Sequence, residues 1–201
     1  MILIGISGKK GSGKDLLASF LKQKYGFMNV PFASELKKKV REDFNLITEH
    51  TDGLLKEKPT EFVERRVHAI NGMIVRTEYW TPRTIMIEYG QFFRQFDPNY
   101  WVKKTFDKID SMNLFKGPDL RFTISDVRFK NEADYIKSKG GLLVRLERKP
   151  ELNIYTPSDD ISETELDDYT GFDFKLHKDM NLIPEHLSKF ADHIMESVLT
   201  K

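Results

Sequence analysis

Short apolar runs alternate along the chain with longer segments in which apolar residues recur at helical spacing. Two runs rich in Ile, Leu and Val, at residues 1–7 and 142–146, predict strands of the kind buried at the centre of a parallel sheet. Phe122, Ile124 and Val127 mark a third strand, which is expected to end at Asp126 or just beyond. Two further strands are predicted at 27–32 and 172–176. Because the segments between these strands are predicted to be helical, we expect an α/β fold in three layers, with a parallel five-stranded sheet covered on both faces.

The stretch from residue 33 to about residue 110 looks mostly helical and is too long for a simple crossover between parallel strands. We therefore expect an insertion that carries a second binding surface. A polar stretch at 148–169 is expected to be a mobile loop. The chain is thus expected to form one domain, with a core at about 1–32, 118–147 and 170–201, an insert at 33–117 and this late loop at 148–169.

The turn after the first apolar run matches the phosphate-binding loop (P-loop) pattern G-x-x-x-x-G-K, between a predicted strand and a predicted amphipathic helix. Its glycines let the backbone turn tightly, so that consecutive N–H groups face a β-phosphate at a helix N-terminus. Lys14 is expected to reach the β- and γ-phosphates as a point charge and to be catalytic. A glycine-rich turn that binds nothing is the competing interpretation. The pattern predicts that ATP is bound by Gly8, Gly11, Ser12, Gly13, Lys14, Asp15 and Leu16.

Two carboxylates are candidate ligands of Mg²⁺. Asp15 stands where the P-loop pattern usually has Ser or Thr, and a carboxylate is also a suitable hard ligand for this ion. Asp126 follows the predicted strand at 122–125, where a second acidic group would hold Mg²⁺ through its waters. Asp126 can equally be a helix cap or a turn residue, and Asp15 can mark a loop that no longer turns over. ATP and Mg²⁺ are the expected cofactors.

Composition excludes several classes of function. The net charge is +1, from 32 basic and 31 acidic residues, so no overall basic field attracts nucleic acid. The absence of cysteine excludes disulfide frameworks, thiolate zinc sites and cysteine nucleophiles. The chain has neither the features of a signal peptide nor an apolar segment of the roughly 20 residues that span a bilayer. We expect a cytoplasmic protein with small-molecule partners and no nucleic-acid or membrane partner; its oligomeric state stays open, with a homodimer as one option.

The arrangement of charged residues distinguishes among the classes of P-loop protein. The chain has no Asn-Lys-x-Asp element for guanine, which argues against a GTPase, and it lacks the size and basic surfaces of helicase-like ATPases. The acidic run at 159–168 is interpreted as a solvated face. A small-molecule kinase needs a second anion site facing the first, and five arginines in predicted loops and helix starts suit that purpose: Arg83, Arg94, Arg128, Arg145 and Arg148.

Several motifs resemble the bacteriophage deoxynucleoside monophosphate kinase family, in the order found in that family. The most specific are Gly-Lys-Asp at 13–15 and Asp-Val-Arg-Phe-x-Asn-Glu at 126–132. Further matches are Phe32-Ala33 leading to Leu36-Lys37, Pro82-Arg83 leading to Gly90, Arg94 with Asp97-Pro98 and Trp101, and Ser162-Glu163 before Leu166-Asp167. The resemblance covers most of the chain and is loose only at about 45–79.

This resemblance implies an adenylate-kinase-like core, with ATP and Mg²⁺ as donor and a (deoxy)nucleoside 5′-monophosphate as acceptor. Glu132, one helical turn after Arg128, is implied to orient that arginine or to meet the base. Arg145 and Arg148 are implied to border the lid and to act in catalysis with Lys14 and Arg128. The acceptor site is implied to comprise Lys10, Lys37, Arg83, Arg94, Trp101, Arg128 and Glu132. If the chain is phage-encoded, its location would be the cytoplasm of the host.

Two other functions stay open. One is a small-molecule kinase on the same core that acts on a coenzyme precursor or a sugar, and the other is a nucleotide-binding regulatory protein without kinase activity. The accepted bases and the choice between ribose and deoxyribose stay open as well. Four aromatic residues are candidates for stacking on a base, with core packing as the alternative: Phe92, Phe93, Tyr100 and Trp101.

Overall fold

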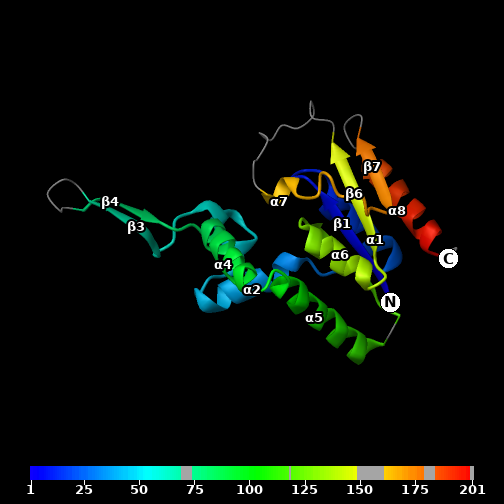
Figure 1. Ribbon diagram of the computed structural model, residues 1–201, viewed down its shortest axis with the longest axis horizontal. Helices are drawn as coiled ribbons and strands as arrows, with labels where there is room; N and C mark the ends of the chain where they lie inside the picture. The colour runs from blue at the N-terminus through cyan, green and yellow to red at the C-terminus, as the bar shows by residue number, and fades with distance from the viewer. Residues whose placement is uncertain (69–73, 118, 149–160, 179–183, 200–201) are drawn as a thin grey trace. The chain divides into compact units, whose positions relative to one another are not determined.

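Five strands form one parallel sheet in the computed structural model, which describes residues 1–68, 74–117, 119–148, 161–178 and 184–199 (Figure 1). They lie in the order β2-β5-β1-β6-β7, and each neighbouring pair is parallel. Because β1 is the central strand, the loop that follows it starts from the middle of the carboxyl edge of the sheet. The strands are β1 (Ile2–Gly8), β2 (Met28–Asn29), β5 (Arg121–Val127), β6 (Leu142–Arg148) and β7 (Phe174–Lys178). The predicted fold class is confirmed.

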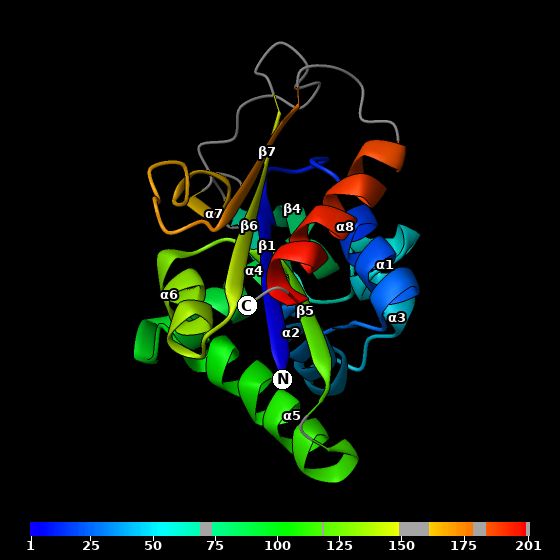
Figure 2. The same ribbon diagram turned by 90° about the vertical axis from the view of Figure 1, so that its right-hand side faces the viewer.

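Helices cover both faces of this sheet and complete the three layers (Figure 2). One face is covered by α1 (Lys14–Tyr25) and α8 (Pro184–Leu199). The other face is covered by α5 (Tyr100–Lys116) and α6 (Lys130–Ser138). The strands buried between these layers favour apolar side chains on both faces, which explains the apolar runs of β1 and β6.

Successive residues of β1 point to opposite faces of the sheet. Leu3 packs in the cluster that contains α5 and α6, whereas Ile4 and Ile6 pack with α1 and α8. Gly5 faces α6, where a Cβ atom would lie 2.7 Å from Cδ1 of Ile136. The glycine thus allows α6 to lie close to the sheet.

The chain divides into two compact units, which we call the sheet unit (Met1–Phe32 with Val102–Lys201) and the insert unit (Ala33–Trp101). The insert was expected to continue to residue 117. It ends earlier because α5 buries Val102, Phe106 and Ile109 in the core of the sheet unit.

The insert unit is a mixture of helices and strands. Its core contains Val40, Ile85 and Met86. The helices and turns are α2 (Phe32–Asp43), which begins at the last residue of the sheet unit, α3 (Thr48–Thr51), the 3₁₀ helix η1 (Leu54–Glu57) and α4 (Pro82–Phe96). The strands are β3 (Val63–His68) and β4 (Ile74–Tyr79).

The antiparallel pair of β3 and β4 was not predicted (Figure 1). For this stretch the expectation of helix is wrong. Val63, Val67, Ile74 and Val75 are β-branched and favour extended backbone. The sequence between the strands contains Asn71-Gly72, a dipeptide typical of hairpin turns, although 69–73 lie outside the described residues.

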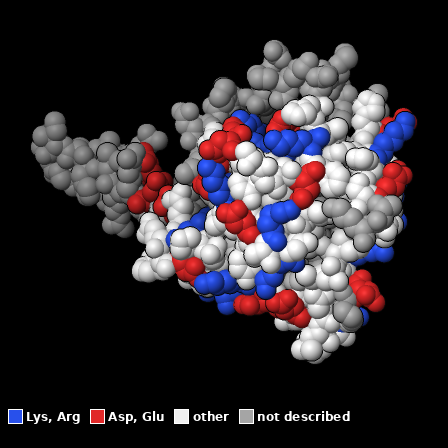
Figure 3. All heavy atoms as spheres, turned by 45° about the vertical axis from the view of Figure 1, so that its right-hand side comes forward, with Lys and Arg blue, Asp and Glu red and all other residues white. Residues whose placement is uncertain are grey.

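The expected lid is only partly described, because 149–160 lie outside the described residues. Its described part opens with α7 (Ile161–Thr164). Within the described ranges, no helix combines the length and apolar composition that crossing a membrane requires. On the face seen in Figure 3, basic and acidic side chains are interspersed.

Candidate active site

The P-loop connects the carboxyl end of β1 to the start of α1 in the sheet unit. Gly8, Gly11 and Gly13 have φ angles of 152°, 74° and 90°, which residues with a side chain rarely adopt. Gly13 directly precedes α1, and the N–H of Ser12 donates to the carbonyl oxygen of Lys9 over 3.0 Å. The backbone therefore forms a tight turn that ends at a helix N-terminus.

Gly8 and Lys14 meet inside this loop. A Cβ atom at Gly8 would lie 2.5 Å from Oγ of Ser12 and 2.6 Å from the carbonyl oxygen of Leu146, so only glycine fits. Nζ of Lys14 donates to the carbonyl oxygens of Gly8 (2.5 Å) and Lys9 (3.0 Å). The backbone of the P-loop thus holds the ammonium group inside the loop that is predicted to bind the phosphates of ATP.

Three other predicted residues of this loop region, Lys10, Asp15 and Leu16, are exposed. Asp15 lies in the first turn of α1. Its carboxylate is therefore accessible beside the loop. Contact of these residues with ATP, the acceptor or Mg²⁺ stays a prediction.

Asp126 lies at the end of β5, which pairs with β1, so it shares the sheet edge of the P-loop. Its Oδ1 accepts a hydrogen bond of 2.8 Å from the N–H of Phe32 at the start of α2. The alternative role of a helix cap is therefore observed, and the metal role stays a prediction. The described part of the chain contains no group of three His, Cys, Asp or Glu residues that could hold a metal. Mg²⁺ at this edge would take most of its ligands from phosphates and water.

Arg128 lies just beyond β5, and its guanidinium contacts α7. Nη1 of Arg128 lies 3.4 Å from the carbonyl oxygen and 3.3 Å from Oγ of Ser162. Oε2 of Glu132 accepts hydrogen bonds from the N–H groups of Arg128 (2.8 Å) and Phe129 (3.1 Å). Glu132 is 3% exposed, which leaves little surface for contact with a base. This geometry suits a role in fixing the backbone of Arg128 at the start of α6.

Arg145, predicted to border the lid and to act in catalysis, is buried in the sheet unit. Its side chain is 7% exposed, its Nη1 donates to Oγ of Ser7 over 3.0 Å, and its Nη2 lies 2.5 Å from Oδ1 of Asp167. The guanidinium lies 5.7 Å from the ring centre of Phe172. These contacts support the fold, and the catalytic role of Arg145 stays a prediction. Arg148 ends β6, and its side chain lies outside the described residues.

Asp167 connects this buried arginine to the P-loop. Its Oδ2 lies 2.7 Å from Nζ of Lys9, and its Oδ1 is the atom that contacts Arg145. One carboxylate thus bridges a cation of the P-loop and a cation of β6. Asp167 is exposed, as expected for a solvated run, and both of its oxygens also have specific partners.

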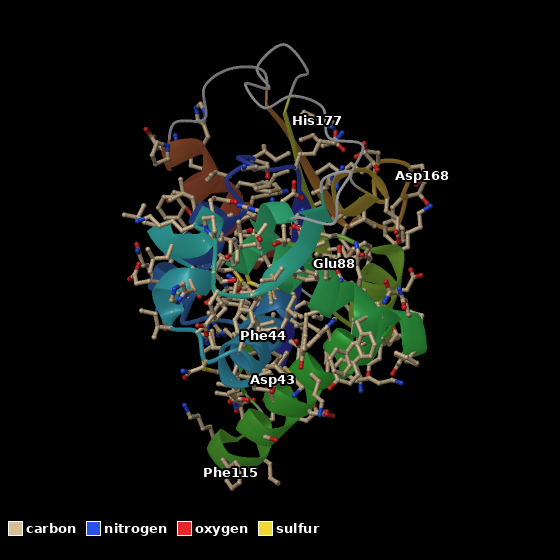
Figure 4. The ribbon with its side chains drawn as sticks, turned by 90° about the vertical axis from the view of Figure 1, so that its left-hand side faces the viewer. Asp43, Phe44, Glu88, Phe115, Asp168 and His177 are labelled. Carbon is tan, nitrogen blue, oxygen red and sulfur yellow. The ribbon has the colours of Figure 1, made fainter. Side chains whose placement is uncertain are left out.

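The neighbours of Asp167 hold the stretch between α7 and β7 against α6. The contacts pair Lys130 with Glu165 and Asp168, Asp134 with Tyr169, and Lys137 with Asp173. Asp168 is labelled in Figure 4. Burial and the hydrogen bond to Asp134 raise the pKa of Tyr169 to about 12. Sequence reasoning missed these pairs because each joins residues more than 30 positions apart, without a local signal.

Lys37, Arg83 and Arg94, three of the predicted acceptor residues, lie in the insert unit. Lys37 belongs to α2, and Arg83 lies in the first turn of α4. Arg94 follows Arg83 by three helical turns, so both lie on one face of α4. Lys10 and Arg128 belong to the sheet unit. That the residues of the insert unit and those of the sheet unit bind the same acceptor phosphate stays a prediction.

Trp101, which is predicted to contact the substrate, is buried, and that contact stays a prediction. It is 2% exposed, and its Nε1 donates to the carbonyl oxygen of Gly90 over 3.1 Å. Its ring also packs edge-on against Phe93 and Tyr100. The tryptophan is therefore part of the packing of the insert unit.

A cavity of about 320 Å³ lies in the insert unit. Its lining includes the aromatic rings of Phe44, Trp80, Tyr89 and Phe92, and the carboxylate of Glu88. Figure 4 labels Phe44, which follows α2, and Glu88, which comes from α4. Among the aromatic residues considered for stacking on a base, Phe92 is the one found in this lining.

No model of a protein family matches the chain. A protein of Acanthamoeba polyphaga mimivirus named "Putative deoxynucleotide monophosphate kinase" is 32% identical over 182 residues, which cover 88% of this chain and 88% of that protein.

Solved structures of other kinases are similar in fold. A sugar kinase from Janibacter sp. HTCC2649 aligns with a TM-score of 0.50 at 11% identity, over 98% of this chain and 95% of that chain. Shikimate kinase from Aquifex aeolicus vf5 aligns with a TM-score of 0.49 at 16% identity, over 99% of each chain. Dephospho-CoA kinase from Campylobacter jejuni aligns with a TM-score of 0.49 at 12% identity, over 98% and 96%. At 11% identity, the likeness to the sugar kinase shows the fold alone.

Proposed function

The chain belongs to the deoxynucleotide monophosphate kinase family, and on this premise we propose that it transfers the γ-phosphoryl group of ATP to a (deoxy)nucleoside 5′-monophosphate. The observation that carries this proposal is a P-loop of the pattern G-x-x-x-x-G-K, with Lys14 held inside it, at the central strand of a parallel sheet. The matched relative comes from Acanthamoeba polyphaga mimivirus, so a bacteriophage origin stays a prediction.

In this proposal, charge and position do most of the catalytic work. The transition state of phosphoryl transfer is loose and highly charged, and the attacking phosphate oxygen is already anionic, so no general base is needed. Lys14 and the N–H groups of the P-loop would hold the donor phosphates. Arg128 would hold the acceptor phosphate, with its backbone fixed by Glu132. Asp167 would keep Lys9 in place.

Asp15 and Asp126 are the residues proposed to hold Mg²⁺, the second through water. Both supply carboxylate oxygens, which suit this hard cation. When bound, Mg²⁺ would neutralise charge on the phosphates. Asp126 can serve only in part, since one of its oxygens accepts the hydrogen bond from Phe32.

Asp15→Asn is expected to raise the Mg²⁺ concentration needed for half-maximal rate by roughly tenfold, with little change in the acceptor KM, because an amide is a weaker ligand than a carboxylate. Asp15→Ser should be better tolerated, since it restores the commoner hydroxyl ligand. Rates measured across a Mg²⁺ titration test this, with Asp110→Asn on an exposed position of α5 as the control. An unchanged titration for Asp15→Asn would remove this carboxylate from the metal site.

The decisive test of the function is a panel of acceptors. Initial rates of ADP formation are measured with the common NMPs and dNMPs, and with sugars and coenzyme precursors, under ATP and Mg²⁺. We expect at least one nucleoside monophosphate to exceed every other acceptor class by roughly 100-fold in kcat/KM. Turnover confined to a sugar or a coenzyme precursor, or no turnover at all, contradicts the proposal.

Arg128→Lys is expected to raise the acceptor KM or lower kcat by roughly tenfold or more, about 1.4 kcal/mol. The reason is that an ammonium group cannot reproduce the two parallel hydrogen bonds of a guanidinium on a phosphate. The affinity for ATP without acceptor, measured by calorimetry, should barely change. Arg121→Lys, at the other end of β5, is the matched control. If ATP binding falls as much as acceptor use does, Arg128 serves the donor site or the fold instead.

A further inference from the structure

The cavity of about 320 Å³ in the insert unit lies on the opposite side of α4 from the arginines that are predicted to bind the acceptor. Phe92 lines the cavity, whereas Arg83 lies nine positions earlier in the same helix. At 3.6 residues per turn, nine positions are about two and a half turns, so the two side chains leave the helix in opposite directions. Arg94, two positions after Phe92, is rotated from it by about 200°. A ligand in the cavity is therefore distinct from a phosphate held by Arg83 and Arg94.

Four aromatic rings form much of the cavity wall, and they do not make a parallel slot. They belong to Phe44, Trp80, Tyr89 and Phe92. The rings of Phe44 and Tyr89 lie edge to face, with centroids 5.8 Å apart and an interplanar angle of 79°. The hydroxyl of Tyr89 donates to Asp43, which holds this ring in place. A planar base stacks best between parallel faces, whereas rings that are turned in different directions suit a compact group between them.

The charge that lines the cavity is negative. Glu88 is exposed, and it makes no hydrogen bond or ion pair with the described part of the chain (Figure 4). Gln91 and Gln95 are neutral, and none of the described lining residues is Lys, Arg or His. Lys39 is already paired with Asp43, over 3.0 Å. The carboxylate of Glu88 is thus left at the cavity without a cation.

We propose that this cavity binds a small organic cation with an alkylated ammonium group. The faces of aromatic rings attract such a cation, and its alkyl groups are removed from water where they contact the rings. Glu88 balances the positive charge of the ligand. An inorganic cation lacks the apolar groups, and a neutral molecule lacks the charge, so both bind more weakly. This site is independent of the proposed function, because it uses neither the P-loop nor the acceptor residues.

NMR of the tryptophan side chains tests the site in the full-length protein, without ATP or acceptor. Trp80 lines the cavity, whereas Trp101, the other tryptophan of the chain, is buried outside the lining. The two indole N–H signals are assigned with Trp101→Phe. We expect tetramethylammonium chloride to shift the Trp80 signal with saturation and the Trp101 signal much less. Two controls should give no saturable shift: tert-butanol, which is neutral and of similar size, and sodium chloride at equal ionic strength.

Two exposed lining residues offer variants with matched controls. Glu88→Gln and Phe92→Leu are each expected to raise the Kd for tetramethylammonium by roughly fivefold or more, since each removes one source of attraction. Glu42→Gln, on an exposed position of α2, should change the Kd by less than about twofold, because its charge is screened by solvent. Phe96→Leu removes an exposed ring one helical turn after Phe92, outside the lining, and should also have little effect. The Tm of each variant establishes that it is folded.

Three results would overturn the inference: no saturable shift of the Trp80 signal, equal binding of tert-butanol, or equal weakening in the control variants. A saturable shift with cytidine and none with tetramethylammonium would assign the cavity to a planar base and would overturn it as well. Because no phosphoryl transfer is measured, a failure of the acceptor panel leaves this result unchanged. Binding of tetramethylammonium therefore stands or falls separately from the proposed function.

Discussion

Lys14→Ala is expected to lower kcat by at least about 10²-fold, or roughly 2.7 kcal/mol of transition-state stabilisation, while the protein stays folded. The Lys14 ammonium lies inside the P-loop, against the carbonyl groups of Gly8 and Lys9. Charge develops on the phosphate oxygens during transfer, so this ammonium group is expected to stabilise the transition state. Steady-state rates of ADP formation with the best acceptor measure the effect.

Lys22→Ala is the matched control, because Lys22 is an exposed lysine in the last turn of the same helix. It should retain the wild-type kcat. Circular dichroism and the Tm of both variants establish that they are folded. Near-normal turnover in a folded Lys14→Ala protein would contradict the assignment of the P-loop.

Asp167→Ala is expected to lower the free energy of unfolding by about 2–3 kcal/mol, because the buried guanidinium of Arg145 loses its contact of 2.5 Å and keeps the more distant Glu147, whose Oε1 lies 4.0 Å from Nε. The partial exposure of Asp167 keeps the loss at the lower end of what a fully buried pair would give. Removing both charges should be milder, so Arg145→Met combined with Asp167→Ala should be more stable than Asp167→Ala alone. Urea unfolding followed by circular dichroism measures these differences. Fluorescence is unsuitable, since Trp80 and Trp101, the two tryptophans of the chain, lie in the insert unit.

Asp168→Ala separates a specific contact from the general charge of this stretch. Asp168 is exposed and pairs with Lys130 at the surface, so its loss should change stability little. If Asp167→Ala and Asp168→Ala lower the free energy of unfolding by similar amounts, the pair of Arg145 and Asp167 stabilises the fold no more than a surface ion pair does. A double variant no more stable than Asp167→Ala alone would lead to the same conclusion.

The sequence by itself determined the sheet and the P-loop, because both depend on local signals. A strand buried on two faces favours a continuous apolar run, and β1 and β6 lie where such runs occur, whereas β5 is marked by Phe122, Ile124 and Val127. A turn with positive φ angles needs glycine, and Gly8, Gly11 and Gly13 supply them. The order of these elements along the chain then favoured one α/β architecture.

Only the tertiary structure decided what the long polar and aromatic side chains do. Arg145 looked like a lid residue, yet it is buried against Ser7 and Asp167, which lie 138 and 22 positions away in the sequence. Trp101 looked like a substrate contact, yet it is buried against Gly90 and Phe93 of α4. Asp167 pairs with cations that lie 22 and 158 positions earlier, so no local pattern could show these contacts. Electrostatic interactions follow distance in space, whereas periodicity reports only distance along the chain.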